Sequence, residues 1–261
     1  MKNKKKIGII GIGAVGGAVA SAMPGALLYD KYKKIGSIEE INKADIIFIC
    51  VPTPYKEDMG FDLSAVKETF SIIKGKKIMV IKSTVLPGTT EKMQKEYPQH
   101  KVLFNPEFLR EVSAKEDMKK PYEQIVGYTQ KSKSVARGVL RILPKSKNEF
   151  LVPSVEAEMV KYFSNTFLST KVIFANQIYD LCQKLNADYD LIKEMAKVSP
   201  RFAFSHFDVW TDGYRGYSGK CLPKDTKALI RFASGLGVDL SLLKLVDEEN
   251  EELLRANKNK K

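Results

Sequence analysis

One cysteine lies in a segment whose neighbours favour nucleophilic chemistry. Cys221 stands two positions before Pro223, and Lys220 and Lys224 lie on either side of it. Because proline suits the first turn of a helix, Cys221 is predicted at a helix N-terminus, where the helix dipole and the two lysines stabilise a thiolate. The segment therefore predicts a nucleophilic thiol with a lowered pKa. Asp225, in the same turn, is placed to orient water or to accept a proton.

The other two cysteines are predicted to pack in the core. Cys50 ends an apolar run, and Cys182 lies on the apolar stripe of a predicted helix. Thiols in such places behave as small hydrophobic side chains. Without its lysine and proline neighbours, Cys221 too would be interpreted as an ordinary loop cysteine.

Glycines spaced for a dinucleotide site follow the first apolar run of the chain. Gly11, Gly13 and Gly16 come directly after Ile7–Ile10, and Asp30 lies about 20 positions beyond the first glycine. The first glycine permits a tight turn, the second lets the backbone approach a pyrophosphate, and the third lets a helix pack closely. The predicted cofactor contacts in this turn are Gly11, Ile12, Gly13, Ala14, Val15 and Gly16.

Asp30 is predicted to hold the ribose hydroxyls of the adenosine. Its charge repels a 2′-phosphate, so the sequence favours NAD over NADP, although Lys31, Lys33 and Lys34 weaken that preference. The alternative is a glycine-rich turn that only packs a helix on a strand.

Two pairs of polar residues are each four positions apart, so each pair shares one face of a helix. Lys161 and Asn165 can together stabilise a developing oxyanion. Glu107 and Glu111 follow a predicted strand end, where two carboxylates can act as general acid and base. Solvated surface charges are the alternative for both pairs.

These residues require elements that bring them to one edge of a sheet. The runs typical of buried strands are 7–10, 26–29, 45–51, 77–81, 102–104, 125–127 and 149–152. Helical patterns follow Gly13 and cover 63–73 and 134–143. Strands that alternate with helices predict an α/β fold, with a Rossmann-type parallel sheet domain over residues 1–153.

The second half, residues 154–261, is predicted to be an all-helical domain for substrate binding and dimerisation. Residues 155–185 contain no proline or glycine, with Ser154 as a candidate N-cap. Apolar residues recur there at helical spacing, at Val160, Phe163, Phe167, Val172, Ala175, Ile178 and Cys182. A helix this long predicts an interface. Shorter helices are expected at 189–197, 225–235 and 240–256, with a loop at 198–221.

Composition excludes several classes of protein. The 261 residues are 44% hydrophobic and 28% charged, which is typical of a soluble globular protein and not of a disordered or polytopic membrane protein. The net charge is +12, but seven of the lysines lie in the two end segments, so nucleic acid is not expected as a partner. Three cysteines favour a reducing compartment, the cytoplasm, and two histidines argue against a His-rich metal site.

The N-terminus imitates a secretory signal. Lys2–Lys6 precede an uncharged run over 7–28 that is nearly long enough to span a bilayer. Five glycines between Gly8 and Gly17 would weaken a membrane helix, and the dinucleotide motif explains their spacing. No membrane association is therefore expected.

Taken together, these segments resemble the UDP-glucose/GDP-mannose dehydrogenase family, and among its members those that act on UDP-glucose. The resemblance covers nearly the whole chain. The segments that carry it are Gly11–Gly13, Val51–Pro54, Lys82–Val85, Asn105–Glu111, Glu156–Tyr162 with Asn165 and Asn176, and Gly219–Asp225. The blocks at 105–111 and 219–225 are highly specific, whereas the glycine block is not.

The resemblance implies a role for each site residue. Cys221 would be the nucleophile, Lys161 and Asn165 the oxyanion partners, and Thr84, Glu111 and Asp225 the groups that manage water and protons. The remaining implied contacts are Thr53, Thr84, Glu111 and Lys224 at the cofactor, and Glu107, Phe108, Leu109, Lys161, Asn165, Tyr217 and Ser218 at the sugar nucleotide. Arg201 matches an arginine that reaches the substrate of a neighbouring subunit.

The resemblance also implies a reaction and an assembly. The C6 alcohol of UDP-glucose would be oxidised to the carboxylate of UDP-glucuronate by two NAD, through a thiohemiacetal and a thioester on Cys221, as a step in polysaccharide biosynthesis. The long helix would form a homodimer, and no metal is implied.

Three departures from the family pattern bear on this expectation. The family has a third, nucleotide-binding domain, whereas this sequence stops near 243–261, within the helix that leads to it. The segment between Asp30 and Val51 is short, and Ser218 replaces a usual glycine. The alternatives are a dehydrogenase of the same family for GDP-mannose or a UDP-N-acetylhexosamine, and a non-catalytic NAD-binding dimerisation partner.

Overall fold

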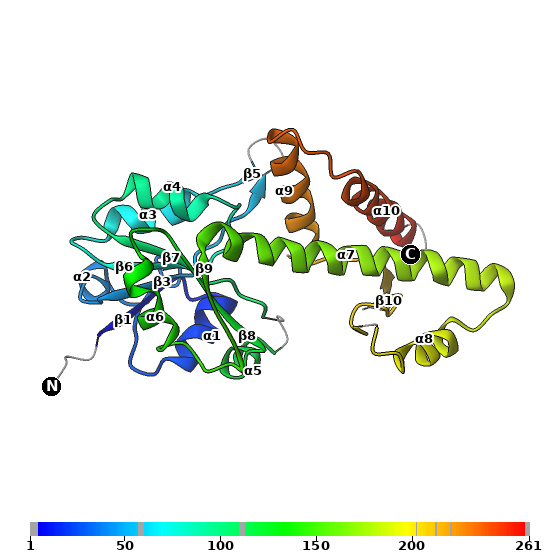
Figure 1. The fold of residues 1–261 in the computed structure, drawn as a ribbon, viewed down its shortest axis with the longest axis horizontal. Helices are drawn as coiled ribbons and strands as arrows, with labels where there is room; N and C mark the ends of the chain where they lie inside the picture. Colours follow the sequence, from blue (N-terminus) through cyan, green and yellow to red (C-terminus); the bar gives the residue numbers. More distant parts are fainter. Residues whose placement is uncertain are drawn as a thin grey trace. The chain divides into compact units, whose positions relative to one another are not determined.

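The computed structural model describes residues 5–56, 60–109, 113–201, 203–211, 213–219 and 221–258 (Figure 1). The chain divides into two compact units, residues 1–161 and 162–261. The division falls inside one long helix, α7 (Ser154–Leu185). The domain boundary expected between 153 and 154 stays a prediction.

The first unit is built on a sheet that is buried on both faces. Among the described residues seven strands form it, in the order β2-β1-β3-β6-β7-β8-β9. In chain order they are β1 (Ile7–Ile10), β2 (Leu27–Tyr29), β3 (Ile46–Ile49), β6 (Ile78–Ile81), β7 (Lys101–Phe104), β8 (Glu123–Tyr128) and β9 (Asn148–Pro153). The Rossmann-type sheet is therefore confirmed. One pair departs from the parallel prediction, because β8 runs antiparallel to β7.

Helices cover both faces of this sheet because successive side chains of each buried strand point to opposite sides (Figure 1). Ile9 and Phe48 pack with α1 (Ala14–Ala22) and α6 (Lys133–Leu140), whereas Ile47 and Ile49 pack with the opposite layer. The other helices of the unit are α2 (Ile38–Ile41), α3 (Ser64–Ile72), α4 (Thr89–Glu96) and α5 (Ala114–Lys119), and a small hairpin joins β4 (Tyr55–Lys56) to β5 (Gly60–Phe61). The sequence predictions missed α2, α4, α5 and this hairpin, all of which are short.

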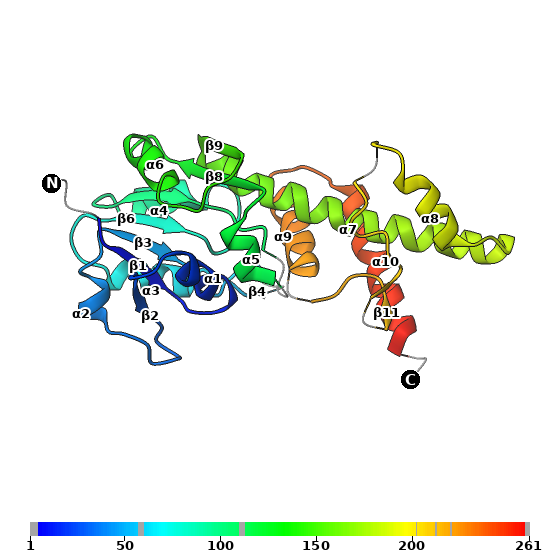
Figure 2. The same ribbon diagram turned by 90° about the horizontal axis from the view of Figure 1, so that it is seen from below.

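The second unit packs three helices and a hairpin along α7 (Figure 2). They are α8 (Tyr189–Lys197), β10 (Trp210–Thr211), β11 (Tyr214–Arg215), α9 (Leu222–Gly235) and α10 (Ser241–Lys258). Two apolar clusters hold them, one around Val172 and Val246 and one around Cys182 and Tyr189. The predicted helical domain is confirmed, with a short hairpin inside the predicted loop. No helix among the described residues combines the length and apolar composition that crossing a bilayer requires.

Glu158, in the second turn of α7, holds the start of another helix. Its fully buried carboxylate accepts the backbone N–H of Gly88 at 2.6 Å and of Thr90 at 2.7 Å, and the Thr90 hydroxyl at 2.6 Å. These N–H groups belong to the first turn of α4, where they have no partner within the helix. The Glu158 side chain therefore caps the N-terminus of α4, a helix distant from it in the sequence.

We predict that Glu158→Gln lowers the free energy of unfolding by about 1–3 kcal/mol, because an amide NH₂ would face one of these buried N–H donors. Glu156→Gln, an exposed change in the first turn of α7, should stay within about 0.5 kcal/mol of the wild type. Urea unfolding followed by circular dichroism measures both. Equal stability of the two variants would show that Glu158 is not a cap.

Candidate functional site

The glycine turn has the shape that a dinucleotide requires. Gly11 has φ +86°, and a Cβ there would lie 2.7 Å from the Cys50 carbonyl oxygen. A Cβ on Gly16 would lie 1.8 Å from the Gly11 carbonyl oxygen. Gly13, by contrast, has no other atom within 4 Å of its Cβ position, so the backbone at the start of α1 is open to a ligand. A pyrophosphate fits this helix N-terminus.

Asp30 ties the end of β2 to this turn. Its Oδ2 accepts the backbone N–H of Ile12 at 2.7 Å, and its Oδ1 accepts those of Tyr32 at 3.0 Å and Lys33 at 2.8 Å. Burial raises the pKa of Asp30, but the three N–H donors and the Lys33 ammonium outweigh it and hold the pKa below its ordinary value. The carboxylate is therefore charged at neutral pH and fixed beside the turn. The sequence predicted its place but not its three backbone partners.

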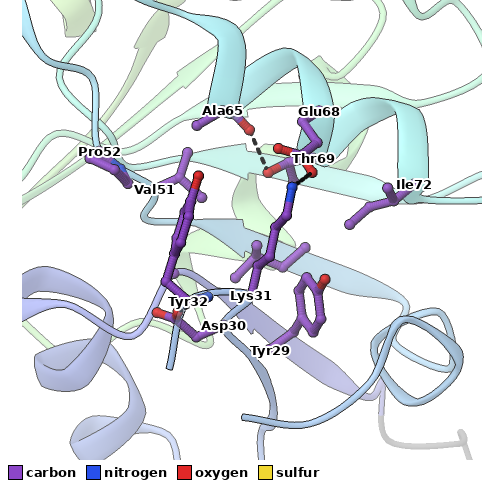
Figure 3. Close-up of a pocket in the computed structure, with 12 residues that line it drawn as sticks. Tyr29, Asp30, Lys31, Tyr32, Val51, Pro52, Ala65, Glu68, Thr69 and Ile72 are labelled. Carbon is purple, nitrogen blue, oxygen red and sulfur yellow. Dashed lines mark hydrogen bonds and ion pairs between the residues drawn. The ribbon is translucent and has the colours of Figure 1, made fainter. Parts of the chain in front are cut away.

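A cleft opens beside Asp30 (Figure 3). Its lining is Ile10, Gly11, Tyr29, Asp30, Lys31, Tyr32, Val51, Pro52, Ala65, Glu68, Thr69 and Ile72. Lys31 reaches across it from the end of β2, and its Nζ donates to Glu68 Oε1 on α3 at 2.6 Å. The mostly apolar wall carries two carboxylates, of which Glu68 is paired with Lys31, and this lining suits an adenosine. The sequence predictions missed the α3 side of this cleft, because Lys31 and Glu68 are distant in the chain.

Thr53 and Thr84, both predicted at the cofactor, lie together. The Thr53 hydroxyl donates to the Thr84 carbonyl oxygen at 2.7 Å. Both follow strand ends, after β3 and β6, on the edge where α/β sheets bind ligands. The glycine turn lies at the same edge of the sheet, because it directly follows the end of β1.

Glu107 and Lys161 form a buried ion pair in the first unit. Lys161 Nζ lies 3.2 Å from Glu107 Oε1 and donates to the Glu107 carbonyl oxygen at 2.8 Å. It also lies 5.6 Å above the centre of the Phe108 ring, and Leu109 N–H donates to the Glu107 carboxylate at 2.9 Å. Burial raises the pKa of Glu107, but Lys161 and Leu109 outweigh it, so the pKa lies below its ordinary value. The pair is therefore ionised, and Lys161 does not lie on a solvated face.

Lys82 is a buried lysine to which the sequence alone gives no role. It directly follows β6, is 3% exposed, and donates from Nζ to Asn105 Oδ1 at 2.7 Å. Asn105 in turn donates to the Ile125 carbonyl oxygen at 2.7 Å. Burial lowers the pKa of Lys82. The contact fixes the start of the segment that carries Glu107, and a lysine directly after a buried strand is the sequence signal that could have indicated it.

In the second unit, the predicted thiol stands at a helix start. Cys221 is exposed and directly precedes α9, with Pro223 in the first turn. Asp225 N–H donates to the Cys221 carbonyl oxygen at 3.0 Å. Cys50 and Cys182 are buried as predicted, and burial raises the pKa of Cys50 to about 12. Of the three thiols, Cys221 is therefore the one that solvent reaches.

A buried carboxylate lies directly behind this thiol segment. Asp225 is fully buried and accepts Asn165 Nδ2 at 2.6 Å and Lys224 Nζ at 2.6 Å. The second hydrogen of the Asn165 amide is left for another acceptor. Asn165, predicted on the basis of its spacing from Lys161, is thus buried beside the thiol segment.

The remaining predicted residues differ in accessibility. Arg201 and Ser218 are exposed, Tyr217 is buried, and the Ser218 hydroxyl donates to Tyr214 Oη at 2.6 Å. Glu111, predicted at both the catalytic and cofactor sites, and Lys220, predicted beside the thiol, lie outside the described residues.

Known proteins match both units. The model of the UDP-glucose/GDP-mannose dehydrogenase family, NAD binding domain, matches residues 26–143, and that of the family's central domain matches residues 155–252. A UDP-glucose 6-dehydrogenase of Rickettsia prowazekii is 34% identical over 222 residues, which are 81% of this chain and 50% of that protein. One of Bacillus subtilis is 32% identical over 228 residues, 81% and 47% of the two chains. The chain thus spans about half the length of the curated relatives it matches.

Solved structures agree with the fold. The structure of a UDP-glucose dehydrogenase from Pyrobaculum islandicum has a TM-score of 0.83 at 30% identity and covers 96% of this chain and 68% of its own. A UDP-D-ManNAc dehydrogenase structure from Pyrococcus horikoshii has a TM-score of 0.82 at 22% identity, which shows the fold alone.

We predict that Asp30→Ala weakens NAD binding about tenfold or more and NADP binding less, because the change removes ribose hydrogen bonds and also the repulsion of a 2′-phosphate. Some loss for both cofactors is expected, since Ile12 N–H loses its acceptor. Fluorescence titration measures both affinities. Asp45→Ala, which removes an exposed carboxylate that accepts the Lys6 N–H at 2.8 Å, is the control. Equal losses for NAD and NADP would exclude Asp30 as the selective group.

Proposed function

The chain belongs to the UDP-glucose/GDP-mannose dehydrogenase family, and on this premise we propose that it oxidises the C6 alcohol of UDP-glucose to the carboxylate of UDP-glucuronate. The observation that carries the proposal is the exposed thiol of Cys221 at the start of α9, with the buried Asn165–Asp225–Lys224 network behind it. Relatives that are named UDP-glucose 6-dehydrogenase favour UDP-glucose as the hexose nucleotide. The sparse cysteines support a cytoplasmic setting, and the acid product suits polysaccharide synthesis.

The first unit supplies the cofactor site. The open backbone at Gly13, the charged carboxylate of Asp30 and the apolar cleft suit the pyrophosphate, ribose and adenine of NAD in turn. NAD, when bound, accepts a hydride in each of the two oxidations. Thr53 and Thr84 fix the strand ends beside this site, because the hydroxyl of one holds the backbone of the other.

Lys161 and Asn165 stabilise the negative charge that develops on the C6 oxygen. Each keeps one N–H for this oxygen, because Lys161 donates two of its three hydrogens to Glu107 and Asn165 donates one of its two amide hydrogens to Asp225. Both side chains are 6% exposed, so water competes little for these donors. Their partners fix them before substrate arrives.

Cys221 holds the sugar covalently through the second oxidation, until hydrolysis releases the product. Its thiolate adds to C6 of the aldehyde, so a C–S bond forms and the carbonyl oxygen becomes the thiohemiacetal oxygen. Loss of hydride from C6 then gives a thioester. Water attacks the thioester carbon, the C–S bond breaks, and the carboxylate leaves as the thiolate returns. Asp225, one helical turn from Cys221, accepts a proton from this water, and the family resemblance assigns Thr84 and Glu111 to the same step.

We also propose that the protein is a homodimer through α7. Large apolar side chains of this helix are exposed, with Phe163 at 70% and Leu185 at 67%. At 3.6 residues per turn, the exposed stripe of Phe163, Phe167, Phe174, Leu181 and Leu185 falls within about 40° around the helix axis. A continuous apolar stripe of this kind supports a partner helix in solution, and a second copy of this chain offers the same stripe.

The thiol prediction separates an enzyme from a cofactor-binding relic. Limiting iodoacetamide should alkylate Cys221 first, because Cys50 and Cys182 are buried. Cys221→Ala should abolish formation of UDP-glucuronate and leave NAD affinity unchanged, because the cofactor residues belong to the first unit. Peptide mass spectrometry and product chromatography measure these results. Equal labelling of the three cysteines, or acid formation by the variant, would contradict the mechanism.

The assembly prediction concerns the exposed stripe. Phe163→Asp should convert a dimer into a monomer at micromolar concentration, because it places an unpaired charge in an apolar interface. Light scattering measures the mass. Phe150→Asp, at an exposed phenylalanine of β9, is the matched control and should remain a dimer. A wild type that is already monomeric would contradict the homodimer.

A further inference from the structure

Two asparagines of α10 each hold the backbone of one residue in the segment that leads to Cys221. Asn250 Oδ1 accepts the backbone N–H of Tyr217 at 2.7 Å, and its Nδ2 donates to the Tyr217 carbonyl oxygen at 2.9 Å. Asn257 makes the same two contacts with Arg215, at 3.3 and 2.9 Å. Each side-chain amide therefore satisfies both backbone groups of one residue.

The two asparagine amides bond to the backbone of this segment as a neighbouring antiparallel strand would. In an antiparallel pair, every second residue exchanges an N–H and a C=O with its partner, and Arg215 and Tyr217 are two apart. Asn250 and Asn257 are two helical turns apart, about 10.5 Å along α10, against about 7 Å between alternate residues of a strand. Long side chains bridge that difference, and α10 lies beside β11 (Figure 2). The helix thus fixes the register of the thiol segment.

The backbone between the two contacts is shaped for the amide. Gly216 has φ +87°, and a Cβ there would lie 2.7 Å from Asn250 Oδ1. Any other residue would push the amide away from Tyr217. Asn250 is 1% exposed, and the Tyr217 side chain is buried in the cluster with Val172 and Val246. The arrangement is rigid and excludes water.

The two ends of the segment differ in how much else holds them. Arg215 donates from Nε to Asn176 Oδ1 at 2.9 Å and pairs with Asp180 at 2.7 Å, so it remains fixed without Asn257. Tyr217 is four residues before Cys221, and the contacts that hold its backbone N–H and C=O are those to Asn250. Loss of Asn250 should therefore change the position of the Cys221 thiol, whereas loss of Asn257 should leave it unchanged.

We propose that Asn250 is a positioning residue for the thiol: it fixes the backbone of Tyr217 and thereby the place of Ser218 and Cys221 in the reaction. The proposal rests on the proposed function in one respect, that Cys221 is the reacting thiol. Misplacement of a reacting group by about 1 Å lowers a rate about a hundredfold. Asn250 would act on turnover without touching substrate or cofactor.

The test compares Asn250→Leu with Asn257→Leu, two changes of similar volume that each remove one backbone contact. Three properties are measured: kcat and KM with UDP-glucose and NAD, the pH dependence of Cys221 alkylation by iodoacetamide, and thermal unfolding.

We expect Asn250→Leu to lower kcat by about tenfold to a hundredfold with KM for NAD unchanged. The midpoint of its alkylation profile should move toward the free-cysteine value of about 8.5. Asn257→Leu should lower the unfolding temperature but keep kcat and the alkylation midpoint of the wild type.

Equal kcat losses in the two leucine variants, or a wild-type midpoint in Asn250→Leu, would overturn the proposal, because the contact would then be purely structural. A wild-type midpoint already at the free-cysteine value would also overturn it. Failure of the proposed function has a different signature: the wild type forms no NADH from UDP-glucose, while Asn250→Leu alone still shifts the alkylation midpoint.

Discussion

Several polar side chains that α7 buries are paired with distant segments of the chain, and these pairs fix groups that the proposed chemistry uses. Five of the buried polar residues of α7, namely Glu158, Lys161, Asn165, Ser169 and Asn176, fall within about 40° of a line opposite the exposed apolar stripe. Unpaired, each would cost several kcal/mol of desolvation, so each has a close partner, such as the start of α4, Glu107 or Asp225. A helix that carries paired polar side chains on its buried face and an apolar stripe on its exposed face is suited to a site on one face and a protein partner on the other.

The cofactor turn depends on a similar constraint at smaller scale. The first turn of α1 approaches the Gly11 carbonyl so closely that a Cβ on Gly16 would overlap it. That contact brings the helix N-terminus to the end of β1, and Asp30 locks the turn from β2 through Ile12 N–H. One carboxylate thus holds the turn, and in the proposed function the same carboxylate binds the ribose. This explains why a single acidic residue after β2 is so informative in the sequence.

The features that the sequence predicted are those that local patterns determine. The apolar runs specified β1, β3 and β6, and the uninterrupted helical spacing specified α7, because burial on both faces or along one stripe leaves a periodic signature. Cys221 at a helix start followed from Pro223 two positions later. The family resemblance then added roles to Lys161 and Asn165 that their spacing alone left open.

The features that the sequence did not predict come from contacts between distant segments. Glu158 is 68 positions from Thr90, and Asn250 is 33 from Tyr217. The local pattern does not distinguish a carboxylate that caps a distant helix from one that stabilises the N-terminus of its own helix. Nor does it distinguish a buried asparagine from an exposed one. Short elements such as α2 and the β10–β11 hairpin also escaped, because a few residues carry little periodic signal.

In the proposed reaction, one chain carries a sugar nucleotide through two oxidations on a thiol. The most direct measurement is the number of NADH formed per UDP-glucose consumed, with UDP-glucose limiting, NAD in excess, and the sugar products identified by mass spectrometry. We expect two NADH for each UDP-glucuronate, with no free aldehyde. One NADH per sugar with an aldehyde product, or no NADH from UDP-glucose when GDP-mannose or a UDP-N-acetylhexosamine is oxidised instead, would contradict the proposed reaction.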